Sequence, residues 1–309
     1  MRQRGITAAV LVPVLLVVLF FGGVVLAAAV AIITVFAAIE AFRLLRSAGH
    51  EGFAVLGTVL ALFVVLEAAF PDVLEGSGLL LVAIGIVLAA VASFTRIDPH
   101  DGLQAWMATV FGALYVALLS FIIRLGHAAP LVPDDAPLHA LGAERGWVLL
   151  LVLAVWSYDT GAYLVGKSIG RTHFLTHISP AKTIEGLVGG VVATTVVVAL
   201  LLWGLGQNPL HALLLGPLTA LAAQSGDLAE SVIKRAAGAK DSGTLIPGHG
   251  GMLDRVDSFV FAAPVVTLYV IALLRGGEVG RGERSASGRA PRFDRIDRTA
   301  DRRCPGGAR

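Results

Sequence analysis

Long apolar stretches recur along almost the whole chain of 309 residues, and they constrain the fold more than any other feature. A helix needs roughly 20 apolar residues to cross the ~30 Å hydrocarbon core of a bilayer. Only 15% of the residues are charged, against about a quarter in soluble domains. The sequence therefore predicts an all-α, polytopic integral membrane protein with about nine transmembrane helices, at residues 6–22, 24–42, 53–70, 77–95, 105–123, 147–166, 186–204, 209–225 and 258–275.

The charges between these stretches predict the orientation in the membrane. With the N-terminus inside, the inner segments hold twelve lysines and arginines, whereas the outer segments hold two, Arg124 and Arg145. Short loops rich in Lys and Arg face the cytoplasm. The loops at 166–185 and 226–257 are therefore predicted to face the compartment that contains nucleotides.

The end of the chain has a different composition. Residues 276–309 contain nine arginines and five acidic residues and lack apolar periodicity, so we expect a disordered tail. Nine spans would place this tail outside, against the charge rule. Either one short stretch does not cross, or the tail comes too late in the chain to influence insertion. The predicted organisation is a transmembrane domain at 1–275, with its motifs at 155–258, followed by the tail.

Acidic residues concentrate in the polar segment 224–257. Asp254 and Asp257 are three residues apart, so on a helix they share a face. Two carboxylates this close repel each other unless a cation lies between them, and Mg²⁺ takes oxygen ligands that it shares with substrate phosphates. Asp227, with Glu230 one turn later, offers a second acidic face. If the two helices meet, Asp227 and Asp254 can hold one or two metal ions.

The bases of the same segment fit a polyphosphate. Lysine and arginine neutralise phosphate oxygens, and the candidates are Lys234, Arg235, Lys240 and Arg255. Glycines let backbone N–H groups approach a phosphate, and Gly248, Gly250 and Gly251 flank His249. For His249 we favour phosphate contact over proton transfer or a purely structural role. A metal, bases and backbone donors together predict an enzyme of phosphoryl or nucleotidyl transfer.

A second polar group lies upstream. Asp159 comes near the end of the sixth stretch, and Ser179 and Pro180 precede the seventh. A Ser-Pro pair is typical of a helix start, with proline in the first turn. Lys182 and Thr183 would then lie near a helix N-terminus, which is a natural anion site.

Plainer roles remain open for some of these side chains. Asp254 and Asp257 could merely form ion pairs on a solvated face. Glu185 either completes a helix cap or binds a metal, and capping is favoured. Glu40 and Glu67 lie at the ends of apolar stretches, where residence at the membrane interface is the default interpretation.

Together these residues resemble a known signature. The run from Ser231 through Lys234-Arg235, Lys240-Asp241 and residues 247–251 to Asp254-Arg255-Val256-Asp257 is similar to that of the phosphatidate cytidylyltransferases, or CDP-diacylglycerol synthases. The stretch from Ser179 to Gly186 resembles the second typical segment of that family. The motifs cover 155–258, and the hydropathy layout agrees over most of 1–275. The arginine-rich tail is not part of the pattern.

The resemblance implies a bacterial inner-membrane enzyme with a polar cavity open to the cytoplasm. It implies attack of the phosphatidic acid phosphate on the α-phosphorus of CTP, giving CDP-diacylglycerol and pyrophosphate. It further implies Mg²⁺, with K⁺ as a candidate second cation, around Asp227, Asp254 and Asp257, and a homodimer without a nucleic-acid partner. The predicted catalytic residues are Asp227, Asp254, Asp257, Lys234 and Arg255. The predicted substrate-binding residues are Lys182, Thr183, Ser179, Ser231, Arg235, Lys240, Asp241, Gly248, His249, Gly250, Gly251 and Asp159.

Two other functions compete with this one. A related enzyme could use CTP on a different membrane lipid, such as an ether lipid or a polyprenol, because only the apolar groove would differ. A secondary transporter is less favoured, because transporters place ionisable groups at the membrane midplane in repeated halves. Here the charges cluster in two loops, and no repeat is evident.

Overall fold

The computed structural model describes residues 13–74, 77–243 and 250–275. Regular structure in these ranges is helical, apart from isolated bridge residues such as the pair His173 and Thr183. Five helices are long and apolar enough to cross a bilayer, and Ala54–Ala69 and Ser77–Ser93 are shorter apolar helices. The prediction of an all-α, polytopic membrane protein is therefore confirmed at this level.

The helices follow the predicted apolar stretches closely. Residues 13–21 are helical, which is the part of the first stretch that the structure describes. The principal helices that follow are α2 (Gly23–Ser47), α3 (Ala54–Ala69), α4 (Pro71–Leu74), α5 (Ser77–Ser93), α6 (Pro99–Ala117), α7 (Phe121–Ala128), α8 (Gly142–Ile169), α9 (Ile184–Gly204), α10 (Ala212–Ala236) and α11 (Leu253–Tyr269). A 3₁₀ turn at Leu118–Ser120 joins α6 to α7.

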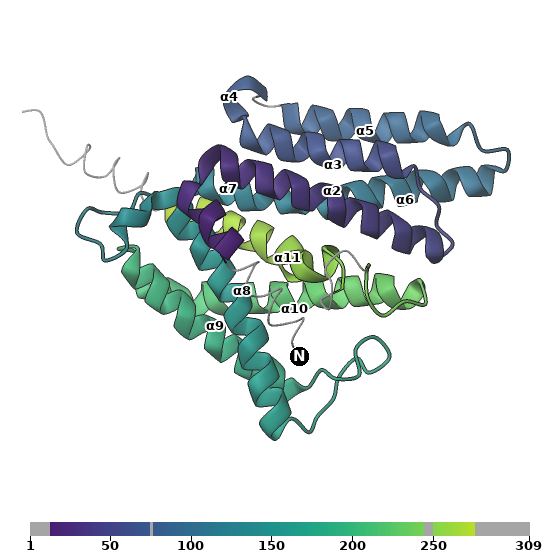
Figure 1. The fold of residues 1–309 in the computed structure, drawn as a ribbon. Helices are drawn as coiled ribbons and strands as arrows, with labels where there is room; N and C mark the ends of the chain where they lie inside the picture. Colours follow the sequence, from purple (N-terminus) through teal and green to yellow (C-terminus); the bar gives the residue numbers. More distant parts are fainter. Residues whose placement is uncertain (1–12, 75–76, 244–249, 276–309) are drawn as a thin grey trace, which may run out of the picture.

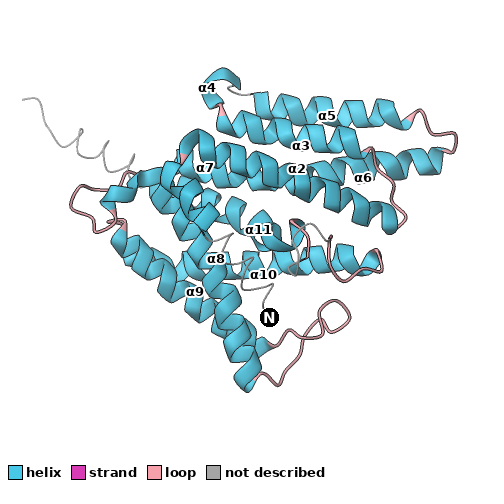
Figure 2. Cartoon of the chain, in the orientation of Figure 1, coloured by secondary structure: helices cyan, strands magenta, loops and turns pink. Residues whose placement is uncertain are grey.

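The helices form two groups that meet at α11. In Figure 1, α2, α3, α5 and α6 run roughly parallel to one another, and α10 and α11 run alongside them. Helices α8 and α9 cross obliquely and pack against each other and against α10. Figure 2 shows that loops join the helices at the two ends of this arrangement. The loops after α2, α5, α8 and α10 all lie at one end, because successive long helices alternate in direction.

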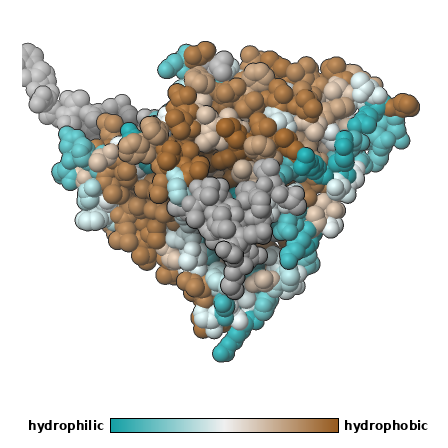
Figure 3. Space-filling view, in the orientation of Figure 1, coloured by the Kyte–Doolittle hydropathy of each residue, from teal (hydrophilic) through white to brown (hydrophobic). Residues whose placement is uncertain are grey.

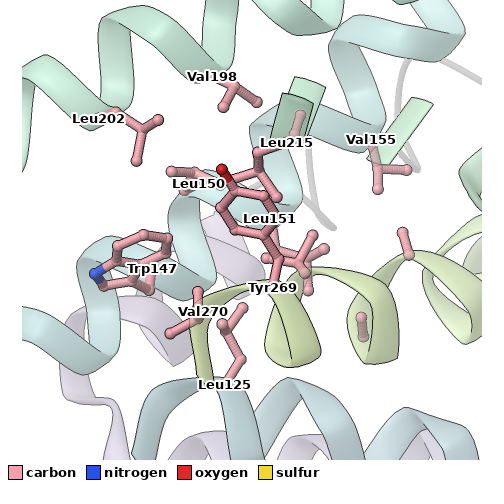
Figure 4. Packing of buried hydrophobic residues seen from close by; sticks show 14 of the residues in the cluster. Leu125, Trp147, Leu150, Leu151, Val155, Val198, Leu202, Leu215, Tyr269 and Val270 are labelled. Carbon is pink, nitrogen blue, oxygen red and sulfur yellow. The ribbon is translucent and has the colours of Figure 1, made fainter. Parts of the chain in front are cut away.

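The core between the two groups is built from large apolar side chains. Figure 4 shows side chains of α8, α9, α10 and α11 interdigitating around Trp147 and Tyr269. Burial of such side chains stabilises the packing by roughly 1.5–3 kcal/mol each relative to water, although lipid-facing residues gain no such term. The fully buried members include Leu125, Trp147, Leu150, Leu151, Val198, Leu202, Leu205 and Leu215.

The outer faces expose apolar side chains instead of polar ones. On α9 the exposed residues recur every fourth position, at Val188, Val192, Val196 and Leu200. A stripe with this spacing is one face of a helix. Figure 3 shows apolar surface over much of the molecule, with hydrophilic residues at its edges. This pattern fits helices whose solvent is lipid.

Candidate active site

The two polar segments that the sequence singles out meet at one end of the helices. The Lys182 ammonium, in the loop between α8 and α9, forms an ion pair with Asp227 on α10. The Arg235 Nε donates a hydrogen bond to the Ile178 carbonyl at 3.2 Å. The loop 170–183 and the C-terminal half of α10 therefore form one polar surface.

Helices α10 and α11 approach each other unusually closely at this surface. A Cβ at Gly226 would lie 2.3 Å from the Asp257 carbonyl oxygen, so only glycine permits this contact. The neighbouring Asp227 lies close enough for its charge to act on Asp257. The structure thus brings together the acidic faces of α10 and α11, and the acid of α11 on which the Asp227 charge acts is Asp257.

Lys234 connects the acids of the two helices. Its Nζ donates to Glu230 Oε2 at 2.5 Å, one turn earlier on α10, and to Asp254 Oδ1 at 2.8 Å on α11. Lys234 lies outside the eighth predicted transmembrane stretch, 209–225, at the end of α10 that faces water in the prediction. Burial alone would lower the pKa of Lys234, but the hydrogen bonds to Asp254 and Glu230 raise it above its ordinary value. The side chain is therefore a fixed positive charge between two carboxylates.

The other oxygen of Asp254 organises the loop before α11. Asp254 Oδ2 accepts hydrogen bonds from the Ser242 N–H at 2.9 Å, the Ser242 hydroxyl at 2.9 Å and the Gly251 N–H at 2.8 Å. Gly250 has a φ of 81°, and a Cβ there would lie 2.6 Å from Asp254 Oδ2. Both oxygens of Asp254 are therefore engaged, and two of the predicted glycines shape the turn around its carboxylate.

A buried glutamate from α2, which the sequence reading placed at the membrane interface, holds the same loop. Glu40 is 3% exposed, and its Oε2 accepts from the Ser242 hydroxyl at 3.1 Å and the Leu253 N–H at 2.8 Å. A Cβ at Gly243 would lie 2.5 Å from Glu40 Oε1. Glu40 therefore has a structural role that the sequence interpretation did not describe, whereas its residence at the membrane interface stays a prediction. Its partners are about 200 positions away in sequence, and a glutamate ending an apolar stretch was the only available signal.

The other glutamate given this reading, Glu67, is also buried. It is 7% exposed and forms an ion pair with Arg124. This pair lies towards the C-terminal end of α3, away from the polar surface. Its role in the structure is to join α3 to α7.

The loop between α8 and α9 differs in detail from the prediction. Helix α9 begins at Ile184, and its N-cap is Thr183, whose hydroxyl accepts from the Gly186 N–H at 3.2 Å. Ser179 and Pro180 lie in the preceding loop, so the predicted Ser-Pro helix start was wrong. The threonine hydroxyl satisfies an otherwise unpaired N–H of the first turn. Lys182 therefore lies immediately before a helix N-terminus, as expected.

Glu185 has a role that neither earlier alternative described. Its carboxylate accepts hydrogen bonds from the Arg171 N–H at 3.1 Å and from the Thr172 hydroxyl at 2.9 Å. Glu185 therefore ties the beginning of the loop to the beginning of α9. This contact closes the loop that carries Lys182.

The remaining predicted residues lie around this surface at different depths. Asp159 on α8 is close enough for the charges of Lys182, Asp227 and Arg255 to act on it. Ser231 is half-buried on α10, and Lys240 and Asp241 are exposed in the following loop. Gly248 and His249 lie outside the described residues, as does the tail 276–309.

The charges of this surface are unbalanced and leave room for a cation. The carboxylates are those of Asp159, Asp227, Glu230, Asp254 and Asp257, whereas the bases are Lys182, Lys234, Arg235 and Arg255. Glu230 Oε1 is buried, and it has no hydrogen-bond partner among the residues that the structure describes. Oxygen donors beside an anionic substrate fit Mg²⁺, which binds one or two carboxylates and substrate phosphates. Within the described ranges no cluster of three or more His, Cys, Asp or Glu residues has the arrangement of a metal site. The residues therefore fit a Mg²⁺ ion whose ligands come partly from the protein carboxylates and partly from the substrate phosphates.

Comparison with known proteins agrees with this chemistry. Residues 2–273 match the cytidylyltransferase family. A phosphatidate cytidylyltransferase of Synechocystis is 36% identical over 267 residues, which is 80% of this chain and 88% of that protein. A phosphatidate cytidylyltransferase of Staphylococcus aureus is 45% identical over 127 residues, 40% of this chain and 49% of that protein. The uncharacterised protein YnbB of Escherichia coli is 39% identical over 197 residues, 63% of this chain and 61% of that protein. The chain belongs to the cytidylyltransferase family.

Proposed function

We propose that this protein is a phosphatidate cytidylyltransferase, which converts CTP and phosphatidic acid into CDP-diacylglycerol and pyrophosphate. The observation that carries the proposal is the meeting of two polar segments at one end of an otherwise apolar helical protein. A lipid substrate requires access from the bilayer, and a nucleotide requires access from water. A polar surface at the ends of membrane helices provides both.

The bases and the acids divide the work between them. Lys182, paired with Asp227 and next to the α9 N-terminus, is placed to hold phosphate oxygens of CTP or of the lipid. Arg255 lies one residue after Asp254 and acts electrostatically on Asp159, so it borders the same surface. Both bases stabilise the negative charge that gathers as the lipid phosphate approaches the α-phosphorus.

The fixed network behind them keeps these groups in place. Lys234 and Asp254 lock α10 to α11, and Ser242 and Gly251 lock the loop to Asp254. Such preorganisation lowers the reorganisation that the transition state would otherwise require. The lipid phosphate is itself an anionic nucleophile, so the reaction needs no covalent enzyme intermediate.

Asp227 and Asp257 are the residues that we propose to hold Mg²⁺ together with substrate phosphates. When bound, the ion would neutralise phosphate charge and polarise the phosphorus centre. Asp254 as a further ligand stays a prediction, because its two oxygens already accept hydrogen bonds from Lys234, Ser242 and Gly251. K⁺ as a second cation and a homodimer also stay predictions.

The orientation that we propose places this surface in the cytoplasm of a bacterial cell, with the protein in the inner membrane. Loop charges support the proposal, because most of the lysines and arginines in the described loops lie at the end that carries Lys182, Arg235 and Arg255. We further propose about nine spans and a cytoplasm-facing polar cavity, supported by the helix at each predicted stretch.

The test is an assay on the purified full chain with radiolabelled CTP and phosphatidic acid, with and without Mg²⁺. We expect a labelled lipid only when phosphatidic acid and Mg²⁺ are both present. Parallel reactions with an ether-linked phosphatidate analogue and a polyprenol identify the rival lipid substrates. Labelling of one of those lipids, with none of phosphatidic acid, would replace the proposed substrate. Nucleotide-independent uptake into proteoliposomes would favour a transporter.

A further inference from the structure

A groove between α2 and α3 lies outside the polar surface described above. It has a volume of about 400 Å³ and is lined by Ile39, Phe42, Arg43, Arg46, Gly52, Ala54, Val55, Thr58 and Val59. Its lining combines apolar side chains with two arginines at one end.

The two arginines give the groove a positive end. Arg46 forms an ion pair with Glu51 at 2.5 Å, whereas Arg43 forms no ion pair with any of the described residues. Arg96 lies 3.9 Å from the same Glu51 but does not line the groove. The groove therefore has at least one arginine whose charge is available to an anion.

The apolar part of the groove opens to the outside of the helices. Val55 is 80% exposed and Val59 is 41% exposed, although both belong to an apolar helix. In a bilayer, such side chains contact lipid chains. Arg43 lies one turn after Ile39 on α2, so the positive charge lies about one helical turn along the groove from its apolar side chains.

The groove is held open by contacts that do not involve a ligand. The Phe42 ring is fixed between two helices, because a Cβ at Gly57 or at Gly112 would lie 2.1 or 2.8 Å from its atoms. The Phe53 N–H donates to the Thr109 hydroxyl at 2.8 Å, which fixes the start of α3 against α6. Phe42 and the start of α3, which line the groove, are therefore held in place without a bound lipid.

We propose that this groove binds a phospholipid with an anionic headgroup from the surrounding bilayer, separately from the substrate. Arg43 and Arg46 contact the headgroup phosphate, and the first part of an acyl chain lies against Phe42, Val55 and Val59. Basic pockets between membrane helices are typical binding places for anionic headgroups. A neutral or zwitterionic lipid lacks the net charge to match the arginines.

The location gives the bound lipid a connection to the catalytic surface. Ile39 lines the groove, and the next residue, Glu40, holds Ser242 and Leu253. A lipid that fixes this part of α2 therefore also fixes the residue that positions the loop before α11.

The test uses the purified full chain and measures lipid retained on the protein by native mass spectrometry. Phosphatidylglycerol is compared with phosphatidylcholine of the same acyl chains, without CTP, so the result is independent of the proposed reaction. Arg43→Gln should weaken phosphatidylglycerol binding about fivefold, because each arginine near an anionic lipid raises the affinity by about that factor. The double variant Arg43→Gln/Arg46→Gln should weaken it about 25-fold. Arg96→Gln is the matched control, because it removes the same charge at the same end outside the groove.

A second variant tests the apolar part. Val59→Trp fills the groove without changing charge and should reduce phosphatidylglycerol retention, whereas the Arg96→Gln control should retain as much as the unaltered protein. Equal retention of the two lipids by the unaltered protein would overturn the proposal. So would equal phosphatidylglycerol binding by the double arginine variant, or cross-linking of two copies through Val55→Cys in a Cys304→Ser background, which would make this face a contact between copies.

Discussion

Replacing Glu40 with alanine removes the acceptor that two donors, the Ser242 hydroxyl and the Leu253 N–H, share in front of α11. Ser242 can still donate to Asp254, but the Leu253 N–H loses its partner at a buried position. An unsatisfied buried donor costs about 1–3 kcal/mol, and the space left by the side chain adds to this. We expect Glu40→Ala to lower the free energy of unfolding by about 3 kcal/mol. Glu40→Gln keeps an oxygen acceptor and should cost about 1 kcal/mol, because only the charge assistance is lost.

The same change should reduce turnover, because the loop that Glu40 holds also surrounds Asp254. The assays are unfolding in mixed micelles, followed by tryptophan fluorescence, and CTP-dependent pyrophosphate release measured below the unfolding range. Glu67→Ala is the control, since it removes another buried glutamate but lies away from the polar surface. It should lower stability and leave kcat and KM of the folded protein unchanged. An alanine variant of Glu40 that is as stable and active as the unaltered chain, or a glutamine variant as damaged as the alanine one, would refute the reasoning.

Three further changes test the site itself. Asp254→Asn places an amide group against the Lys234 ammonium and should reduce kcat about 100-fold, equivalent to about 2.7 kcal/mol of transition-state stabilisation. The detergent-solubilised variant should still elute from a size-exclusion column like the unaltered protein. Full activity would remove Asp254 from the mechanism. Lys182→Gln breaks the ion pair with Asp227 and should raise KM for CTP about tenfold with little change in Tm, and an unchanged KM would contradict phosphate contact. Gly226→Ala forces a Cβ to within 2.3 Å of the Asp257 carbonyl and should lower the free energy of unfolding by about 1–3 kcal/mol; an unchanged unfolding midpoint would show that α10 and α11 can separate without loss.

The sequence predicted the helices well because the signal for each one is local. A long apolar stretch must be helical in a bilayer, since no other open structure satisfies its backbone there. The helices therefore fall on the predicted stretches from 24–42 onward. The composition also indicated the two polar segments, and Lys182 and Asp227 do come together.

The exact partners were harder to predict, because they depend on how distant helices pack. A spacing of three residues indicated that Asp254 and Asp257 share a helix face, but not that Asp254 bonds to Lys234 while Asp257 lies within range of the Asp227 charge. Ser179 and Pro180 gave a plausible helix start, yet Thr183 takes the capping position because the loop closes on Glu185. Glu40 carried no signal of its own, since its two partners lie 202 and 213 positions later.

The long separation between Glu40 and its partners has a consequence for how the protein is made. While the ribosome is still producing the middle of the chain, α2 enters the membrane carrying a carboxylate that has no donor waiting for it. Such a group is costly inside hydrocarbon, and its position near one end of α2 lets it remain in contact with water until α11 arrives. Closure of the loop before α11 is therefore among the last steps of assembly, and a chain released before α11 is complete has an open, hydrated end at α2.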